Sequence, residues 1–305
     1  MRVALTGATG MIGSALVREL RARGDEPTAL SRNAARASGS LGVEAAEWRA
    51  PKDEPPPLDA LRGRDAVVNL IGENLAQRWS DESKREIRDS RILTTRNLVA
   101  ALAALPEAER PRVLISQSAS GWYGAQGEER LEESEPSGSD FLARLTADWE
   151  AEARTADELG MRVVLTRTGV VLAESGGALE KMLPFFKLGI GGPVAGGRQF
   201  VPWVHIDDVV GALLFALDTP EALGPLNVSA PEPVTNKELS QALGRVLHRP
   251  AFAPVPALAV KTLYGEMAWV VTTGQRAVPA RLQELGYEFR RPELEAALRD
   301  ATGRA

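Results

Sequence analysis

The stretch TGATGMIG, residues 6–13, decides the fold because of where it lies in the chain. Residues 2–6 just before it are short and aliphatic, which predicts a strand, and residues 12–23 carry apolar side chains at helical spacing. Gly24 then stands where a helix commonly ends on glycine. A strand, a glycine-rich turn and a helix in this order predict the first half of a βαβ unit.

The three glycines of this turn have separate physical tasks. Gly7 permits the tight turn, Gly10 lets backbone approach a pyrophosphate, and Gly13 allows the helix to pack closely on the strand. The first amides of the helix and its dipole then favour phosphate groups. Glycines also gather at turns for structural reasons alone, but this placement indicates a dinucleotide site. The expected contacts are Gly7, Thr9, Gly10, Met11, Ile12 and Gly13.

Most of the chain repeats this alternation of short β-rich runs and amphipathic helical runs. Further strands are expected at residues 26–31, 66–70, 112–116 and 162–166. Helices are expected after the N-caps Ser80 and Thr235 and over residues 141–159. These patterns predict an α/β fold, a Rossmann-type doubly wound parallel sheet over residues 1–228, with a smaller C-terminal lobe over residues 229–305 that closes the pocket.

Composition limits the classes of function. Hydrophobic residues make up 44% and charged residues 25% of the chain, as in ordinary globular proteins. A net charge of −5 without basic blocks argues against nucleic acid as a partner. No apolar run reaches the roughly 18 residues that span a bilayer, and no signal-peptide pattern opens the chain, so we expect a cytoplasmic protein. There is no cysteine and only two histidines, far apart in sequence, so no metal site is expected.

The end of the second expected strand indicates which dinucleotide is bound. It reads Ser31-Arg32, where an NAD-binding domain usually carries an acid for the ribose hydroxyls. The guanidinium of Arg32 can instead form a bidentate pair with a 2′-phosphate, and Ser31 can donate a further hydrogen bond. The alternative is that Arg32 is an ordinary solvated arginine. The sequence therefore favours NADP(H) as the cofactor.

Together with the glycine turn, several segments resemble the extended short-chain dehydrogenase/reductases of the NAD-dependent epimerase/dehydratase type, most closely their atypical epimerase-family branch. The matching segments are VNLIGEN (68–74), SR (90–91), RTGVVL (167–172), KMLP (181–184), WVHIDD (203–208) and GQR (274–276). The resemblance implies cofactor contacts beyond the glycine turn. They are Leu70, Ile71, Gly72, Glu86, Arg91 and Val171. Surface solvation of Glu86 and Arg91, and a core position for Val171, are the alternatives.

The catalytic pattern of the family is incomplete in this chain. Family enzymes use a Ser or Thr after the strand that is expected here at residues 112–116, together with a Tyr and a Lys four residues apart on the next helix. Ser118 matches the first role, but Phe141 and Leu145 align with the Tyr and the Lys. Neither side chain can move a proton.

Two other residues are possible proton donors. Tyr123 is the nearest phenol, and a structural or substrate-lining role is the alternative for it. His205 stands just before an expected helix, where Asp207 or Asp208 is suited to capping, and the capping role is favoured over acid catalysis. The resemblance thus implies Ser118 and Tyr123 as candidate catalytic residues.

The expected substrate side also departs from enzymes that act on nucleotide sugars. Those enzymes commonly carry a basic residue where Val201 aligns here, which argues against a diphosphate-bearing substrate. The glycine-rich residues 189–197 are expected to form a flexible loop that can act as a lid. The candidates for lining the pocket are Glu73, Asn74, Arg78, Trp79 and Gln199.

Three functions are compatible with these patterns. The first is an NADP(H)-dependent oxidoreductase or epimerase-like enzyme acting on an unidentified small molecule, which Ser118 and the polar Glu73-Asn74 pair favour. The second is an NADP(H)-binding regulator or redox sensor without catalysis, which Phe141 and Leu145 favour. The third and weaker is a nucleotide-sugar epimerase. The substrate and the oligomeric state are left open.

Overall fold

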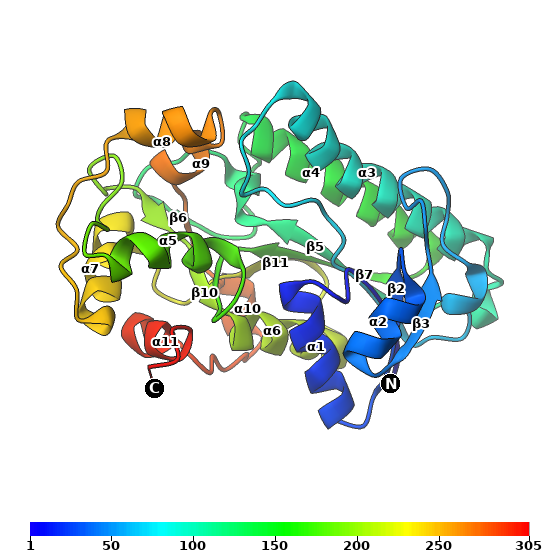
Figure 1. Cartoon of the computed structure of the whole chain (residues 1–305). Coiled ribbons are helices and arrows are strands. Elements are labelled where there is room, and N and C mark those ends of the chain that lie inside the picture. The colour runs from blue at the N-terminus through cyan, green and yellow to red at the C-terminus, as the bar shows by residue number, and fades with distance from the viewer. Residues whose placement is uncertain (305) are drawn as a thin grey trace.

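A seven-stranded parallel sheet forms the centre of the computed structural model, which describes residues 1–304 (Figure 1). Its strand order is β11-β7-β5-β4-β1-β2-β3, so the order reverses beside β1. In such sheets, ligands bind at the carboxyl ends of the strands near this reversal. The strands are β1 (Arg2–Thr6), β2 (Glu26–Ser31), β3 (Glu44–Glu47), β4 (Ala66–Asn69), β5 (Val113–Ala119), β7 (Arg162–Thr168) and β11 (Gly224–Val228).

Two helical layers cover the sheet, because side chains alternate between the two faces of a strand. In β1, Val3 and Leu5 pack toward one layer and Ala4 packs toward the other. The helices of the first layer are α1 (Met11–Ala22), α2 (Ala34–Leu41) and α6 (Ile206–Asp218). Those of the second are α3 (Asp81–Ala104) and α4 (Phe141–Arg154). The expected doubly wound α/β fold is confirmed.

The residues outside the central sheet and its two helical layers form smaller helices and short strand pairs beside the sheet (Figure 1). Leu179, Leu243 and Leu298 share one core that holds α5, α7 and α11 together. The helices are α5 (Gly177–Lys187), α7 (Asn236–Leu247), α8 (Ala257–Tyr264), α9 (Ala268–Thr272), α10 (Ala280–Glu284) and α11 (Leu294–Asp300). The pairs are β8 (Val170–Leu172) with β10 (Trp203–His205), β9 (Phe200–Val201) with β12 (Val234–Thr235), and β6 (Arg130–Leu131) with β13 (Arg276–Ala277).

The region of helices α8 and α9 contacts the amino-terminal end of α3. The guanidinium of Arg78 donates to the carbonyl oxygen of Thr262 at 2.6 Å, and Lys84 forms an ion pair with Glu266 at 2.8 Å. Trp79 and Gly265 form a parallel bridge between the two segments. The C-terminal residues therefore contact the segment that follows β4, at the carboxyl edge of the sheet.

Local signals in the sequence account for the helix starts. The Ser80 hydroxyl accepts from the Ser83 amide at 3.1 Å, and the Thr235 hydroxyl accepts from the Glu238 amide at 3.2 Å. The helix expected over residues 141–159 is α-helical only to Arg154, and its last turn is a 3₁₀ helix. No helix among residues 1–304 is both long and apolar enough to cross a membrane.

Candidate functional site

The glycine turn forms a tight cradle at the carboxyl end of β1. Gly7 has φ +64°, and a Cβ on it would lie 2.6 Å from the carbonyl oxygen of Leu70. A Cβ on Gly13 would lie 2.3 Å from the carbonyl oxygen of Gly7. Both distances are far below van der Waals contact, so only glycine fits without moving backbone.

The first turn of α1 is suited to phosphate. Gly10 is the N-cap residue of α1, and its backbone is extended with no side chain to accept from the first amides. Gly10 and Thr9 are exposed, so these amides lie at an open edge of the fold. The free donors and the positive end of the helix dipole favour an anionic group there.

The loop after β4 is held against this cradle by a buried hydrogen-bond network. The Thr6 hydroxyl donates to the side-chain oxygen of Asn69 at 2.7 Å and accepts from the Leu70 amide at 3.1 Å. The Asn69 side chain in turn donates to Thr95 on α3 at 3.0 Å. The network sets the carbonyl of Leu70 beside Gly7. That Leu70, Ile71 and Gly72 border the cofactor stays a prediction.

Ser31 and Arg32 lie where β2 ends and the turn into α2 begins. The Ser31 hydroxyl accepts from the Asn33 amide at 3.3 Å, and Asn33 caps α2 through the Arg36 amide at 2.9 Å. Arg32 is exposed, and its side chain makes no hydrogen bond or ion pair with any residue from 1 to 304. Its guanidinium is therefore available to an external anion.

The two α3 residues implied by the resemblance lie in different surroundings. Arg91 is buried, and its guanidinium donates to the carbonyl oxygens of Ile87 at 3.0 Å and Glu73 at 2.9 Å. Burial lowers the pKa of Arg91 to about 10, so it stays charged at neutral pH. Glu86 is instead paired with Lys52 at 2.7 Å on a half-exposed surface.

The segment after β8 lies beside the glycine turn. Val171 packs against the core below α1, and a Cβ on Gly176 would lie 3.2 Å from the Met11 sulfur. Gly177 is similarly close to Met11, at 3.5 Å. The segment that follows β8 therefore lies beside Met11, the first residue of α1. Whether Val171 touches the cofactor stays a prediction.

Ser118 lies inside the protein as part of a charged cluster. Its hydroxyl donates to Oε1 of Glu150 on α4 at 2.6 Å. Glu150 also receives two hydrogen bonds from the Arg167 guanidinium, at 2.8 Å and 3.1 Å. All three side chains are buried. Glu150 is not among the residues predicted from the sequence. Arg167 has one signal in the sequence, because it is a charged residue within a buried strand.

Tyr123 joins this buried cluster from the turn after β5. Its hydroxyl lies 2.7 Å from the side-chain oxygen of Asn227 and accepts from Arg167 at 3.3 Å. Burial raises the pKa of Tyr123 to about 12, so the phenol stays protonated at neutral pH. This placement favours the structural role for Tyr123. A catalytic role for Ser118 or Tyr123 would require the cluster to open.

Phe141 and Leu145, which align with the family Tyr and Lys, lie in apolar surroundings. Phe141 packs edge-on against Trp79 with ring centroids 5.2 Å apart. Leu145 is buried in the same cluster, which also includes Trp149 and Met267. The cluster encloses most of Trp79, which is 8% exposed. No proton can pass along these side chains.

The remaining pocket candidates divide into exposed and anchored residues. Glu73 and Asn74 are exposed, and the Asn74 side chain accepts from the Ala76 amide at 2.8 Å. The Gln199 amide is instead used internally, because it donates to the carbonyl oxygens of Val194 at 3.1 Å and Val271 at 2.8 Å.

The glycine-rich loop at 189–197 is packed rather than free, contrary to the expectation of a flexible lid. A Cβ on Gly192 would lie 2.0 Å from the carbonyl oxygen of Ala253, and Val194 forms a bridge with Val255. The glycines of this loop therefore allow close backbone contact with the segment before α8.

His205 caps α6 itself, which corrects the expectation that Asp207 or Asp208 does so. Nδ1 of His205 accepts from the Asp207 amide at 3.2 Å, and Nε2 lies 3.1 Å from Asp300 on α11. Asp208 is buried and accepts from the amides of Arg290 at 2.6 Å and Arg291 at 2.9 Å, so it anchors the C-terminal chain.

His205, Asp207 and Asp300 are close enough to hold a metal ion, although the sequence suggested no metal site. The Arg291 guanidinium already contacts both carboxylates, at 3.3 Å to Asp300 and 3.8 Å to Asp207. This cation offsets part of the negative charge of the two carboxylates.

We expect acidification to lower the free energy of unfolding through His205. Burial lowers the pKa of His205 below its ordinary value of 6.5, against the opposing charges of Asp207 and Asp300. The unfolded chain therefore binds the proton first, and the free energy of unfolding falls as pH drops below about 6.5. Protonation also removes the acceptor on Nδ1. Urea unfolding at about pH 7.5 and 5.5 should show a smaller loss for His205→Asn than for the wild type, and equal losses would contradict this account.

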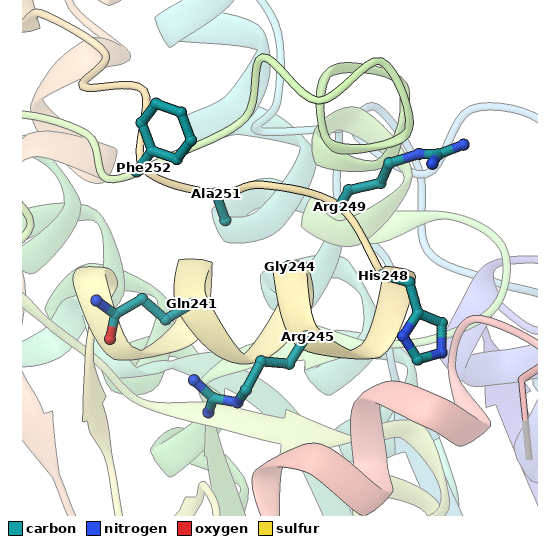
Figure 2. A pocket seen from close by; sticks show the side chains of 7 residues that line it. All are labelled: Gln241, Gly244, Arg245, His248, Arg249, Ala251 and Phe252. Carbon is teal, nitrogen blue, oxygen red and sulfur yellow. The ribbon is translucent and has the colours of Figure 1, made fainter.

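A groove of about 640 Å³ lies away from the glycine turn, between α7 and the chain that follows it (Figure 2). Arg245 in this groove pairs with Glu295 at 2.7 Å, and Arg249 donates to the carbonyl oxygen of Lys187 at 3.1 Å. The lining residues are Gln241, Gly244, Arg245, His248, Arg249, Ala251 and Phe252. None of them was predicted as a site residue.

The sheet order, the glycine cradle and the α1 amino terminus together define a dinucleotide-binding protein of the short-chain dehydrogenase/reductase type. Residues 3–229 match the model of the NAD dependent epimerase/dehydratase family, and residues 255–301 match a domain family of unknown function, DUF1731. The chain belongs to the NAD-dependent epimerase/dehydratase family.

Relatives match over nearly the whole chain. The chloroplastic epimerase family protein SDR39U1 homolog of Arabidopsis thaliana is 41% identical over 98% of this chain and 86% of its own. Mouse SDR39U1 is 40% identical over 98% of this chain and 99% of its own. The crystal structure of human SDR39U1 with NADPH has a TM-score of 0.89 and 36% identity, and covers 100% of both chains.

Proposed function

We propose that this chain is an NADP(H)-dependent oxidoreductase or epimerase-like enzyme that acts on a small molecule. The observation that carries the proposal is the cradle at Gly7 and Gly13, where any side chain would meet backbone. It leaves the first amides of α1 open to a pyrophosphate, and Arg32 stands free for a 2′-phosphate. The NADPH in the structure of the human relative supports the same cofactor.

Within this proposal, the chain divides near Ser229 into a Rossmann domain over residues 1–228 and a lobe over residues 229–305. The contacts of Arg78 with Thr262 and of Lys84 with Glu266 support a lobe that closes the pocket where α8 and α9 meet the amino-terminal end of α3. Bound NADP(H) would supply the hydride chemistry. This chain's residues would bind the pyrophosphate at α1, orient the cofactor along Leu70–Gly72 and exclude water with α8 and α9.

Hydride transfer to or from a substrate also needs a group that donates or accepts a proton. Ser118 and Tyr123 remain the candidates, although both are buried around Arg167. The apolar contacts of Phe141 and Leu145 favour the second candidate function, an NADP(H)-binding regulator or redox sensor without catalysis. A nucleotide-sugar epimerase is the weakest candidate, because Val201 lies in β9 paired with Val234 and offers no charge to a diphosphate.

We expect NADPH to bind more tightly than NADH, and Arg32→Ala to remove most of the preference. A hydrogen bond to a charged group contributes roughly 1.5–3 kcal/mol, which corresponds to about ten- to a hundredfold in affinity. NADH binding should hardly change, because the glycine cradle still holds the pyrophosphate. Calorimetric titration of both cofactors measures this.

Arg18→Ala is a matched control, because Arg18 is an exposed arginine on α1 whose contact is a 3.6 Å pair with the neighbouring Glu19. It should leave both affinities unchanged. Equal affinities for NADPH and NADH in the wild type, or a preference that survives Arg32→Ala, would contradict the role of Arg32. The glycine cradle would then indicate a dinucleotide without indicating which one.

A further inference from the structure

Helix α8 is apolar on nearly every side but buries little of its surface against the rest of the protein. Its sequence is ALAVKTLY, in which only Lys261 is charged, and Val260 is its one buried residue. Leu258 is 74% exposed, and Leu263 is exposed as well. A helix that is apolar on all sides is usually buried, so we expect a further surface to cover α8.

More exposed apolar side chains lie on the chain next to α8. Val194 and Val255 form a parallel bridge between the glycine-rich loop and the segment that leads into α8. Leu188 and Ile190 are exposed on the first of these segments, and Phe252 is 81% exposed on the second, where it follows α7 (Figure 2). We call these side chains and the exposed leucines of α8 the α8 face. It consists of Leu188, Ile190, Phe252, Leu258 and Leu263.

The charge around the α8 face is positive, although the chain has 41 acidic residues and a net charge of −5. Residues 239–265 contain arginine and lysine but no Asp or Glu, and the same holds for residues 181–206. Lys187, Arg249 and Lys261 are exposed and form no ion pair with any residue from 1 to 304. The α8 face is therefore complementary to a surface that is both apolar and negatively charged.

A second copy of this chain does not fit this charge pattern. In a symmetric dimer the same patch of both subunits meets, so Lys187, Arg249 and Lys261 would face their own copies, and like charges across an interface are unfavourable. A membrane surface with anionic lipids offers acyl chains to apolar side chains and phosphate groups to lysine and arginine. The charge pattern therefore favours a lipid surface as the occupant.

We propose that the α8 face docks on a membrane surface that carries anionic phospholipids. Phe252 and Leu258 would insert at the boundary between head groups and acyl chains, while Lys187, Arg249 and Lys261 would contact phosphate groups. The proposal does not depend on the cofactor function, because none of these residues belongs to the glycine cradle or to the loop after β4.

The test is co-sedimentation of the full chain with vesicles of phosphatidylcholine, with or without phosphatidylserine. The protein should sediment with the vesicles that contain phosphatidylserine, and added salt should weaken this binding because it screens exposed charges. Leu258→Ser should weaken binding about tenfold, through the loss of a buried apolar side chain. Lys187→Gln and Lys261→Gln should each weaken it about fivefold.

Two exposed residues away from the α8 face provide matched controls. Leu223, just before β11, is an exposed leucine, and Arg18 is an exposed arginine on α1. Leu223→Ser and Arg18→Gln should leave vesicle binding unchanged. Urea unfolding should show that Leu258→Ser keeps the stability of the wild type within about 0.5 kcal/mol, because the side chain is at the surface.

Three results would overturn the proposal. The first is no binding to either kind of vesicle, and the second is equal binding to both, which would remove the role of the cations. The third comes from sedimentation equilibrium without vesicles. A dimer that Leu258→Ser dissociates would assign the α8 face to a second copy of the chain, whereas a wild type that stays monomeric and binds only the phosphatidylserine vesicles supports the proposal.

Discussion

Glu150→Gln should lower the free energy of unfolding by about 3–5 kcal/mol, since it leaves the buried Arg167 guanidinium without its hydrogen-bonded carboxylate. Burial alone would lower the pKa of Arg167, but the hydrogen bonds and charge of Glu150 raise it above the ordinary value. The Ser118 hydroxyl would also lose its carboxylate acceptor. Urea unfolding of the wild type and the variant at neutral pH measures the difference.

Glu152→Gln provides a control on the same helix. Glu152 pairs with Arg96, whose side chain is 58% exposed, and solvent-exposed pairs contribute at most about 1 kcal/mol. The double variant Glu150→Leu with Arg167→Met should recover much of the lost stability, because two apolar side chains leave no buried charge. A loss below about 1 kcal/mol for Glu150→Gln would show that water or another group compensates Arg167.

The parts of the fold that the sequence predicts well are those with strong local signals. Residues 2–6 and 26–31 form strands with the expected bounds, because apolar runs bounded by glycine or polar turns allow few other structures. The N-caps Ser80 and Thr235 start their helices for the same local reason. The helix α2, the strand β3 and the strand β11 have weaker patterns and were not foreseen.

The candidate site also has parts that local sequence signals predict and parts that depend on contacts between distant residues. The glycine cradle could be predicted because its geometry depends on three glycines close together in the chain. The pairing of Ser118 with Glu150 could not, because nothing local distinguishes the inward-facing Glu150 from the exposed side of the same helix. The capping role of His205 and the anchoring role of Asp208 likewise depend on α11 and the chain before it, which are distant in sequence.

The cradle leads to the second large effect, which is that Gly13→Ala should abolish binding of NADPH and NADH alike. The added Cβ would lie 2.3 Å from the carbonyl oxygen of Gly7 and 2.7 Å from Cα of Ala8, so the turn must move away from α1. Loss of two hydrogen bonds to a charged pyrophosphate corresponds to roughly 3–6 kcal/mol, or more than about a hundredfold in affinity.

The fold should survive this change, since overpacking of one methyl group costs about 1–3 kcal/mol. Calorimetric titration of both cofactors, together with urea unfolding, separates lost binding from lost structure. Gly39→Ala is the matched control, because a Cβ at that α2 position meets no atom within 4 Å. It should leave both affinities unchanged. Wild-type affinity in Gly13→Ala would mean that the pyrophosphate is held elsewhere, because a turn displaced from α1 cannot present the same amides to it.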